Sequence, residues 1–455
     1  MNTQSRTKHT VKPTAKPTPK PQDTRAAAAQ TLAQVLRHGL SLSALLAPAV
    51  ERVAPRDKGL LQELCYGSMR WFPELNACLQ QLLEKPLKPK DSDIQALLLL
   101  GLYQLRHTRI PDHAAIDATV NAAKVLKKHW AAKLINGLLR TYQRQREELE
   151  LELADDAAFV SAHPKWMIKA IEAAWPDAAP QIFAANNGHP PFTLRLNPAF
   201  ASRTDALAQL AERQLPAQVT AFSPVGITLD KATDVDQLPL FGEGGMSVQD
   251  EAAQLAAGLL QLQPGQRVLD ACAAPGGKTG HILEAEPGLR EVIALDSDPK
   301  RLLRVAENLT RLRPASAHKM QCGDATDPSA WWDGELFERI LIDAPCSGLG
   351  VVRRHPDIKL LRKPADIAKL AQLQQQILTA LWPLLAPGGV LVYATCSILP
   401  QENTQTVEAF VQAQADAQCD TLDVAWGREQ PCGRQLLPQA DGHDGFYYAR
   451  LRKQP

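Results

Sequence analysis

The chain has 455 residues, of which 45% are hydrophobic and 22% charged, with a formal net charge of +1 at pH 7. This length predicts roughly two to four domains, and the composition predicts a soluble globular protein rather than a fibrous or membrane one. Because no apolar run reaches membrane-spanning length and no secretory signal begins the chain, we expect a cytoplasmic protein without a membrane anchor.

The first 24 residues predict a disordered basic tail. Together with Arg25 they carry six basic side chains against Asp23 as the one acidic residue, and Lys-Pro pairs recur. Such a stretch is usually a solvated, extended segment. Weak attraction to nucleic acid, independent of base sequence, is the alternative role.

Residues 25–146 predict an all-helical domain. Apolar residues recur at three- and four-residue spacing, as at Ile116 and Val120, which is the pattern of amphipathic helices. Asp112 stands at the predicted start of one of these helices, where its side chain is placed to cap it.

An acidic run at 147–156 predicts a charged connector, so we expect a linker over residues 147–163. Residues 164–245 then mix short helical runs with strand-like segments at Phe192–Leu196 and Val225–Leu229. This pattern predicts a small, moderately basic α+β region. We assign it as a connecting and RNA-binding region, although the pattern alone does not give its role.

Residues 246–455 predict an α/β domain. Short apolar strands alternate with helices there, which is typical of a parallel sheet with crossover helices. Because the ligand crevice of an open α/β sheet lies beyond the carboxyl ends of its strands, we expect the residues that follow the strands to converge on one pocket. These residues are Asp270, Asp296, Asp324, Asp343 and Cys396.

The loop after the first of these strands reads DACAAPGGKTGHI, residues 270–282. Its Gly277-Lys278-Thr279 resembles the end of a P-loop, but Cys272 stands where a P-loop needs its first glycine. Pro275 also removes an amide donor from the loop. The spacing does not fit the dinucleotide fingerprint either, so a phosphate cradle is not expected.

Small residues in this loop allow a ligand to approach the backbone closely. Asp296, at the end of the second strand, is placed to accept hydrogen bonds from ribose hydroxyls. The two features predict a nucleoside without phosphates, such as S-adenosylmethionine. The alternative is that Asp296 and Asp324 are only turn or cap residues.

Three segments resemble the loops of the RNA cytosine-C5 methyltransferase family: Asp270–Thr279, Asp343-Ala-Pro-Cys346-Ser-Gly348, and Tyr393-Ala-Thr-Cys396-Ser397 followed by Glu402-Asn403. The helical front half, through residues 100–106 and 111–118, resembles the NusB-like RNA-binding domain. This combination, with residues 353–359, is similar to family members that act on 16S rRNA.

The resemblance covers nearly the whole chain after the tail. It implies a class I S-adenosylmethionine-dependent methyltransferase domain, with a Rossmann-like, mostly parallel sheet, preceded by the NusB-like domain and the α+β region. The implied cofactor pocket comprises Cys272, Ala273, Ala274, Pro275, Gly276, Gly277, Lys278, Asp296, Asp324 and Asp343.

Methylation at cytosine C5 explains a need for two cysteines. C5 is a poor nucleophile until a thiolate adds to C6, and a second group is then useful as base or release catalyst. Cys346 and Cys396 follow two adjacent predicted strands, and residue chemistry alone leaves open which of them attacks. A Pro-Cys pair is the nucleophile of DNA cytosine enzymes, whereas the resemblance implies attack by Cys396 and release by Cys346.

The other candidates have alternatives of their own. Asp343 is placed to hydrogen-bond the cytosine edge, to join the cofactor pocket, or to act only structurally. The resemblance puts Lys278 in the active-site loop, and a surface lysine is its alternative. Cys272 is expected only to pack near the cofactor. With no CxxC pair among eight cysteines, we expect free thiols, no metal site, and bystander roles for Cys65, Cys78, Cys322, Cys419 and Cys432.

The expected partner is 16S rRNA, naked or in an early small-subunit particle, bound by a monomer. The target base must be unpaired or flipped out. Phosphate contact is predicted, with a solvated face as the alternative, for Arg353, Arg354, Lys359, Arg362 and Lys363. Two rival functions are the same chemistry on transfer RNA or 23S rRNA, and a non-catalytic RNA-binding or antitermination factor.

Overall fold

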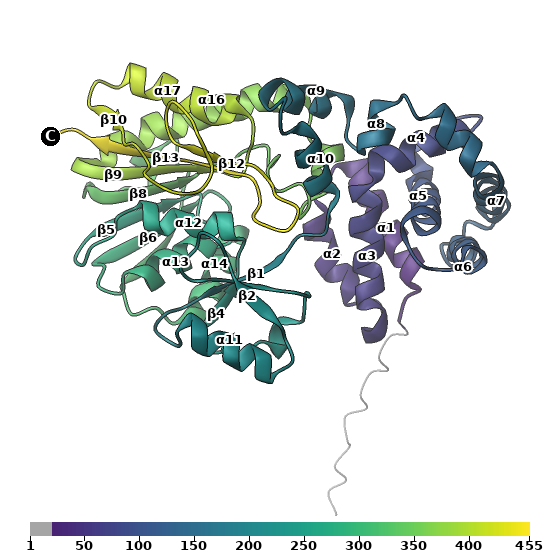
Figure 1. Cartoon of the computed structure of the whole chain (residues 1–455), viewed down its shortest axis with the longest axis horizontal. Coiled ribbons are helices and arrows are strands. Elements are labelled where there is room, and N and C mark those ends of the chain that lie inside the picture. The colour runs from purple at the N-terminus through teal and green to yellow at the C-terminus, as the bar shows by residue number, and fades with distance from the viewer. Residues whose placement is uncertain (1–20) are drawn as a thin grey trace, which may run out of the picture. The chain divides into compact units, whose positions relative to one another are not determined.

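The computed structural model describes residues 21–455. They form two compact units, one of residues 21–65 and 87–140 and the other of residues 66–86 and 141–455. Figure 1 shows the helices and strands of both. Residues 1–20 of the predicted basic tail lie outside the described residues, and the first helix already begins at Thr24.

Every described element of the first unit is helical, as the spacing of apolar residues predicted. Helix α1 packs against α5 because residues 26–29 of α1 are four fully buried alanines. Gly101 of α5 leaves room for Leu139, since a Cβ at this position would meet that side chain at 2.6 Å. The helices are α1 (Thr24–His38), α2 (Leu42–Val50), the 3-10 turns η1 (Pro55–Asp57) and η2 (Pro89–Asp91), α5 (Ser92–His107), α6 (Asp112–Val125), and the N-terminal parts of α3 (Lys58–Arg70) and α7 (His129–Glu152).

Two details of this region differ from the predictions. Asp112 is the first residue of α6, and Pro111 is its N-cap, so the carboxylate lies in the first turn, where the helix dipole favours it. The acidic run does not begin a connector, because α7 continues to Glu152 across one non-helical residue, Gln145. An ion pair of Arg146 with Glu150, one turn apart at 2.8 Å, supports this helical end.

The second unit contains a small antiparallel sheet in the order β2-β3-β1-β4. The strands are β1 (Phe192–Leu196), β2 (Ala217–Val219), β3 (Gly226–Leu229) and β4 (Met246–Val248), with helix α11 (Arg203–Glu212) and the 3-10 turn η3 (Val235–Gln237). The two predicted strands are therefore present. Residues 246–248, which we placed in the α/β domain, pair with β1 and complete this sheet instead.

The larger sheet has nine strands, in the order β11-β12-β13-β9-β8-β5-β6-β7, with β10 paired to β13. Strands β7, β6, β5, β8 and β9 are parallel, as predicted, and β13 is antiparallel to β9. Their bounds are β5 (Arg267–Ala271), β6 (Glu291–Asp296), β7 (His318–Cys322), β8 (Phe337–Asp343), β9 (Leu385–Thr395), β10 (Ala417–Cys419), β11 (Arg428–Glu429), β12 (Arg434–Leu436) and β13 (Phe446–Lys453).

Helices cover both faces of this sheet (Figure 1). Val268, Val292 and Val390 of the strands pack with α12 (Glu251–Leu259), α13 (Gly277–Ala285) and α14 (Pro299–Leu312). The alternate strand residues Leu269, Ile293 and Leu391 pack with α16 (Pro364–Leu381) and α17 (Thr404–Ala413). This alternation follows from the two-residue period of a strand. Shorter elements are α15 (Ile358–Leu361) and the 3-10 turns η4 (Pro328–Ala330), η5 (Trp382–Leu384) and η6 (Pro400–Glu402).

The second unit has four further helices. They are α4 (Phe72–Leu82), α8 (Ala157–Ser161), α9 (Lys165–Ala174) and α10 (Ala179–Asn187). Met167 of α9 and Ile182 of α10 share a core with Leu349 and Ile398, which lie on the loops after β8 and β9. Among residues 21–455, no helix is both long and apolar enough to cross a membrane.

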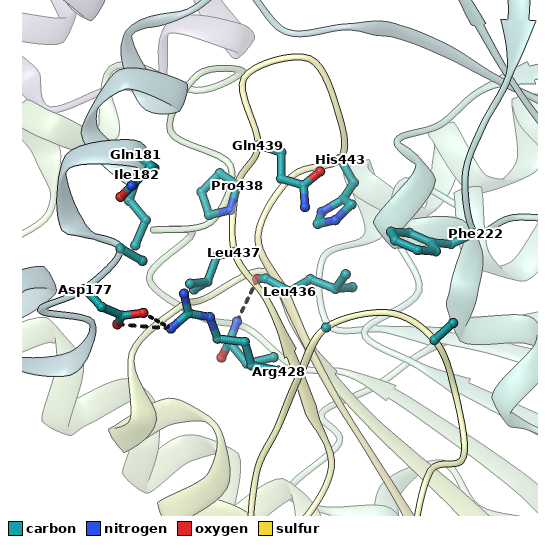
Figure 2. A pocket seen from close by; sticks show the side chains of 14 residues that line it. Asp177, Gln181, Ile182, Phe222, Arg428, Leu436, Leu437, Pro438, Gln439 and His443 are labelled. Atoms are coloured by element: carbon teal, nitrogen blue, oxygen red, sulfur yellow. Dashed lines mark hydrogen bonds and ion pairs between the residues drawn. The ribbon is translucent and has the colours of Figure 1, made fainter.

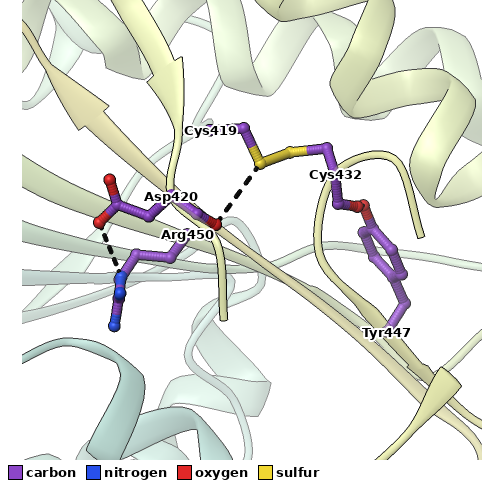
Figure 3. The surroundings of a disulfide bond; sticks show 5 residues. All are labelled: Cys419, Asp420, Cys432, Tyr447 and Arg450. Carbon is purple, nitrogen blue, oxygen red and sulfur yellow. Dashed lines mark hydrogen bonds and ion pairs between the residues drawn. A yellow bond between two sulfur atoms is a disulfide. The ribbon is translucent and has the colours of Figure 1, made fainter. Parts of the chain in front are cut away.

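One cysteine prediction is wrong. Cys419 and Cys432 form a disulfide bond (Figure 3), so they are not free thiols. Strands β10 and β12 both pair with β13, and this shared neighbour brings the two cysteines together. Tyr447 of β13 donates a hydrogen bond to the carbonyl oxygen of Cys432 beside the bond. No sequence spacing marks such a contact, because it depends on strand pairing.

Candidate active site

The strand order of the larger sheet reverses between β5 and β8. The chain passes from β5 to β6 and β7 on one side, and then to β8 and β9 on the other. Ligands of open α/β sheets bind beyond the carboxyl ends of the strands at this point. Asp270 is the next-to-last residue of β5, Asp343 is the last residue of β8, and Cys396 directly follows β9.

The two candidate cysteines are adjacent. The Sγ atoms of Cys346 and Cys396 are 3.2 Å apart. Cys346 lies on the loop after β8, residues 344–350, and Cys396 begins the loop after β9, residues 396–403; we call these the cysteine loops. They are joined at the backbone, because Gly350 N donates to the carbonyl oxygen of Cys396 at 2.9 Å. A side chain at residue 350 would collide with backbone at 2.1 Å, so this approach requires glycine.

Glu402 holds the two cysteine loops together. Its carboxylate is fully buried and accepts hydrogen bonds from the backbone N of Ser347 at 2.7 Å and from the hydroxyls of Ser347 and Ser397, each at 2.5 Å. These two serines directly follow Cys346 and Cys396 in the chain. One buried carboxylate therefore fixes the backbone beside both thiols.

Asn403 supports the same arrangement from the β9 side. Its Nδ2 donates to the carbonyl oxygen of Ser397 at 3.0 Å and to Gln435 Oε1 at 2.7 Å, and its Oδ1 accepts from Thr395 Oγ1 at 2.5 Å. Three side chains on three elements therefore hold the residue that follows Cys396. The cysteine loops have their hydrogen bonds satisfied within the protein.

Lys278 lies beside the thiols with its side chain only 11% exposed, so the surface-lysine alternative is wrong for it. Its Nζ donates to Asp343 Oδ2 at 2.7 Å and lies 5.0 Å from the ring centroid of Phe446. Burial alone would lower the pKa of Lys278, but Asp343 and the nearby Cys396 thiol raise that pKa above its ordinary value. An ammonium therefore persists next to Cys396.

The charges near Cys346 are negative, in contrast to the Lys278 ammonium near Cys396. The hydrogen bond with Cys396, burial, and the negative charges of Cys396 and Glu402 together raise the pKa of Cys346 well above its ordinary value. Cys346 therefore stays a protonated thiol. The cation thus lies near Cys396, and the carboxylate lies near Cys346.

Residues 270–279, which we call the cofactor loop, lead from β5 into α13. Gly276 has φ of +95°, and a Cβ there would meet the backbone of Val305 at 3.1 Å. Two side chains of α14 hold carbonyl oxygens of the cofactor loop. Arg301 donates to the carbonyl oxygen of Ala274 at 2.9 Å, and Asn308 donates to that of Pro275 at 2.8 Å. The loop is thereby shaped as a cradle of small residues.

Within the cofactor loop, Asp270 keeps a free oxygen atom. Thr279 donates to its Oδ2 at 2.6 Å, whereas the buried Oδ1 has no hydrogen-bond partner in the structure. Burial raises the pKa of Asp270 to about 7. An unpartnered buried polar atom beside a glycine cradle is a feature that a polar ligand would complete, so this loop fits a nucleoside such as S-adenosylmethionine.

Asp296 and Asp324 differ in position. Asp296 is buried, and its Oδ2 accepts from the backbone N of Ala274 at 3.1 Å, which ties it to the cofactor loop. Asp324 is exposed, and its Oδ1 accepts from the backbone N and the hydroxyl of Thr326, both at 2.8 Å. Asp324 thus makes the contacts of a turn residue.

Cys272 lies in the cofactor loop at φ of +62° and packs against the core. Burial, and next the negative charges of Asp343 and Asp296, raise the pKa of Cys272 far above its ordinary value, so Cys272 does not supply a thiolate.

The sequence did not predict the roles of three residues. Glu402 and Asn403 support the thiol pair, and Asp270 has a buried oxygen atom without a partner. The adjacent Glu402-Asn403 was visible as a motif, but its contacts were not.

The predicted phosphate contacts are wrong for Arg353 and Lys359, which are buried, whereas Arg354 and Arg362 are partly exposed. Arg353 is 1% exposed and donates to Asp444 at 2.6 Å, and Lys359 is 3% exposed and donates to the carbonyl oxygen of Arg70 at 2.7 Å. Arg362 donates to the carbonyl oxygen of Cys346 at 3.1 Å. These cations are part of the framework, and Lys363 remains exposed. Among residues 21–455 no cluster of His, Cys, Asp and Glu could hold a metal ion.

Family models match most of the chain. The model described as 16S rRNA methyltransferase RsmB/F matches residues 257–452, and the NusB family model matches residues 22–144. A model for the RsmF/B-like ferredoxin-like domain matches residues 163–236. The predicted fold classes are thereby confirmed, and the α+β region is ferredoxin-like.

Curated relatives match nearly end to end. Ribosomal RNA small subunit methyltransferase B of Pseudomonas putida is 54% identical over 429 residues, which are 94% of this chain and 98% of the relative. The protein of the same name from Vibrio vulnificus is 48% identical over 432 residues, 95% of this chain and 100% of the relative.

Solved structures agree in fold. The crystal structure of PH0851 has a TM-score of 0.79 at 22% identity and covers 94% of this chain and 99% of its own. The structure of NSun6 from Pyrococcus horikoshii with SFG has a TM-score of 0.58 at 20% identity, covering 65% of this chain and 100% of its own.

Proposed function

Because the chain belongs to the family of 16S rRNA methyltransferases RsmB/F, we propose that it transfers a methyl group from S-adenosylmethionine to C5 of a cytosine in 16S rRNA. In this proposal Cys396 bonds transiently to C6 of the base, and Cys346 assists its release. The observation that carries it is the pair of thiols 3.2 Å apart at the carboxyl edge of the sheet. An enzyme of 16S rRNA acts where ribosomes are assembled, so we also propose a cytoplasmic location.

The first step is addition of the Cys396 thiolate to C6. An ordinary thiol with a pKa of about 8.5 is only roughly 3% ionised at pH 7. The Lys278 ammonium and the hydrogen bond from the Cys346 thiol both stabilise the negative charge on Cys396. As the sulfur–C6 bond forms, the electron pair of the C5–C6 double bond moves toward C5, which becomes nucleophilic.

Asp343 and Lys278 form a pair that faces the same chemistry. Asp343 is placed to hydrogen-bond the cytosine edge, with its orientation fixed by the 2.7 Å contact to Lys278. S-adenosylmethionine, when bound, supplies a methyl group that C5 can take from its sulfonium sulfur. Residues 272–278 and Asp296 would hold it, through close backbone approach at Gly276 and the buried Asp296 carboxylate.

Release reverses the first bond. C5 gives its proton to a water molecule, the C5–C6 double bond forms again, and the sulfur–C6 bond breaks with both electrons returning to Cys396. The protonated Cys346 thiol, held 3.2 Å away, donates its hydrogen bond to the departing thiolate. Glu402 acts as a positioning residue, because it fixes the residues that follow both cysteines.

The proposal is tested with S-adenosylmethionine and 16S rRNA that contains 5-fluorocytidine. Release of the base requires loss of a proton from C5, and a fluorine atom at C5 cannot leave in this way. A protein–RNA adduct that resists denaturation should therefore accumulate. Cys396→Ala should form no adduct, whereas Cys346→Ala should still form it. Absence of an adduct with the unsubstituted protein would overturn the proposal, and an adduct only with transfer RNA or 23S rRNA would move the chemistry to that substrate.

A further inference from the structure

A cavity of about 480 Å³ lies next to the cysteine loops. Its walls come from α10, from the loop before β3, and from the loops that flank β12. Figure 2 shows Gln181 and Ile182 on one side of it, and Arg428, Gln439, His443 and Phe222 around the rest. None of these side chains takes part in the chemistry proposed above.

Hydrogen bonds connect the cavity to Cys396. The loop 437–445 supplies Gln439 and His443, and its last residue, Gly445, donates from N to the carbonyl oxygen of Gly350 at 2.8 Å. Gly350 in turn donates to the carbonyl oxygen of Cys396. Trp175, which packs in one core with Ile182 of the cavity wall, donates from Nε1 to the carbonyl oxygen of Ile398 at 2.6 Å. Gln435, which lines the cavity, donates from Nε2 to the carbonyl oxygen of Ser397 at 3.1 Å, so the cavity adjoins the loop that Cys396 begins.

The lining suits a flat, uncharged, hydrogen-bonding group. The rings of Phe222 and His443 lie 5.7 Å apart at the cavity, and Ile182 is a buried apolar wall. The amide side chains of Gln181 and Gln439 are exposed at its edge and can both donate and accept. This is the combination of aromatic face and amide that reads an unpaired nucleobase.

The charges at the rim do not suit a phosphate. Arg428 is already paired with Asp177 at 2.8 Å (Figure 2). Its guanidinium also lies 5.7 Å from the ring centroid of Trp175. The Asp177 carboxylate would repel a phosphate brought to the same place. The charges of Arg428 and Asp177 at the rim thus cancel, which favours binding of the base of a nucleotide over its phosphate.

We propose that this cavity, bounded by Gln181, Phe222, Gln439 and His443, binds a second unpaired nucleobase of the RNA substrate, close in the chain to the cytosine that is methylated. The proposal rests on the proposed function for its substrate. It gives the protein a site that selects RNA by the shape of the strand around the target, separate from the thiol pair.

The test fills the cavity from its exposed edge. Gln181→Trp and, from the opposite wall, Gln439→Trp replace exposed amides by a large ring, so neither disturbs the core. Ala184→Trp is the matched control, because Ala184 is exposed on the same helix and does not line the cavity. Both filling variants should raise KM for 16S rRNA and the Kd for RNA alone about tenfold. Affinity for S-adenosylmethionine and kcat should not change, and Ala184→Trp should match the unsubstituted protein.

The occupant is identified with RNA that carries a single abasic residue at each position flanking the methylated cytosine. One abasic position should weaken binding to the unsubstituted protein about tenfold and add nothing to the defect of Gln181→Trp. Equal effects at every position, or an unchanged KM in both filling variants, would overturn the proposal. So would a loss of S-adenosylmethionine binding, because the cavity would then serve the cofactor.

The two proposals fail separately. RNA binding is measured without methyl transfer, so it reports on the cavity even if no 5-fluorocytidine adduct forms. An adduct that forms equally in Gln181→Trp at low RNA concentration would leave the proposed function standing and overturn the nucleobase site.

Discussion

The cysteine loops and the cofactor loop lie at the same edge of one sheet, but they are held in different ways. In the cysteine loops the polar groups bond to one another, through Glu402 and Asn403. In the cofactor loop neighbouring side chains hold the backbone from outside, and Asp270 Oδ1 stays buried without a partner. The difference suggests that the nucleophile is positioned before substrate arrives, whereas the cofactor loop is completed by what it binds.

Lys278 belongs to both regions, because it lies in the cofactor loop and pairs with Asp343 at the end of β8. Lys278→Met should therefore have the largest effect, a fall in kcat of about thirtyfold at pH 7, since only roughly 3% of an unassisted thiol is ionised there. The deficit should shrink as pH rises toward 9, because more thiol then ionises without help. Methyl transfer to 16S rRNA measured across this range is the readout.

Lys278→Arg keeps the cation and serves as the control for Lys278→Met. It should retain most of the rate and the flatter pH profile of the unsubstituted protein. A profile for Lys278→Met that is low but parallel to the unsubstituted one would show that Lys278 acts only through packing.

Breaking the clamp within the cysteine loops should have the next largest effect. Glu402→Gln keeps the size of the side chain but replaces one acceptor oxygen by a donor, so the bonds to Ser347 and Ser397 cannot all persist. We expect kcat to fall about tenfold while KM for S-adenosylmethionine stays the same, because the thiols lose their alignment. An equal rise in KM for S-adenosylmethionine would contradict the separation of the two regions.

The cofactor loop should make the free energy of unfolding depend on pH, through Asp270. The pKa of Asp270 is raised from 3.8 to about 7, so the folded protein holds a proton that the unfolded chain releases. Between these two values the stabilisation from the protonated group is lost as pH rises, and the free energy of unfolding falls. Asp270→Asn should remove this part of the pH dependence without bound ligand. Thermal unfolding of both proteins at pH 5 and pH 8 measures it, and identical slopes would contradict it.

A disulfide outside both regions gives the smallest expected effect on activity. Replacing Cys419 and Cys432 by serine should leave kcat unchanged while lowering the free energy of unfolding by about 3 kcal/mol, the entropy of closing a short loop. The bond joins residues 13 positions apart near β13. Denaturant unfolding and a methyl-transfer assay on the same preparation check both halves. A loss of kcat at unchanged stability would contradict this expectation. It would mean that the disulfide affects the position of Asn403, through β12 and the hydrogen bond of Gln435 to Asn403.

Much of the carboxyl edge of the larger sheet was predictable, because the sequence pattern of each strand shows where that strand ends. Strands that run into Asp270, Asp296 and Asp343 show where a parallel sheet ends, and the carboxyl ends of such strands share one edge. The neighbouring thiols followed from the same rule. The domain assignment of residues 246–248 failed because a three-residue strand joins whichever sheet offers a free edge.

The remaining features depend on contacts between distant segments. Arg353 reads as a surface cation until Asp444, 91 residues later, is found 2.6 Å away. Glu402 likewise gains its role from Ser347, 55 residues earlier. A charge pattern shows that a side chain is basic or acidic, and only the fold shows whether its partner is solvent, RNA or the protein itself.

The most direct test of the account is the location of the bond between protein and RNA. The complex trapped on 5-fluorocytidine RNA would be digested with nuclease and protease, and the peptides weighed by mass spectrometry. The account predicts a nucleotide on the peptide that contains Cys396 and none on the peptide that contains Cys346. A nucleotide on Cys346, with Cys396 unmodified, would contradict it.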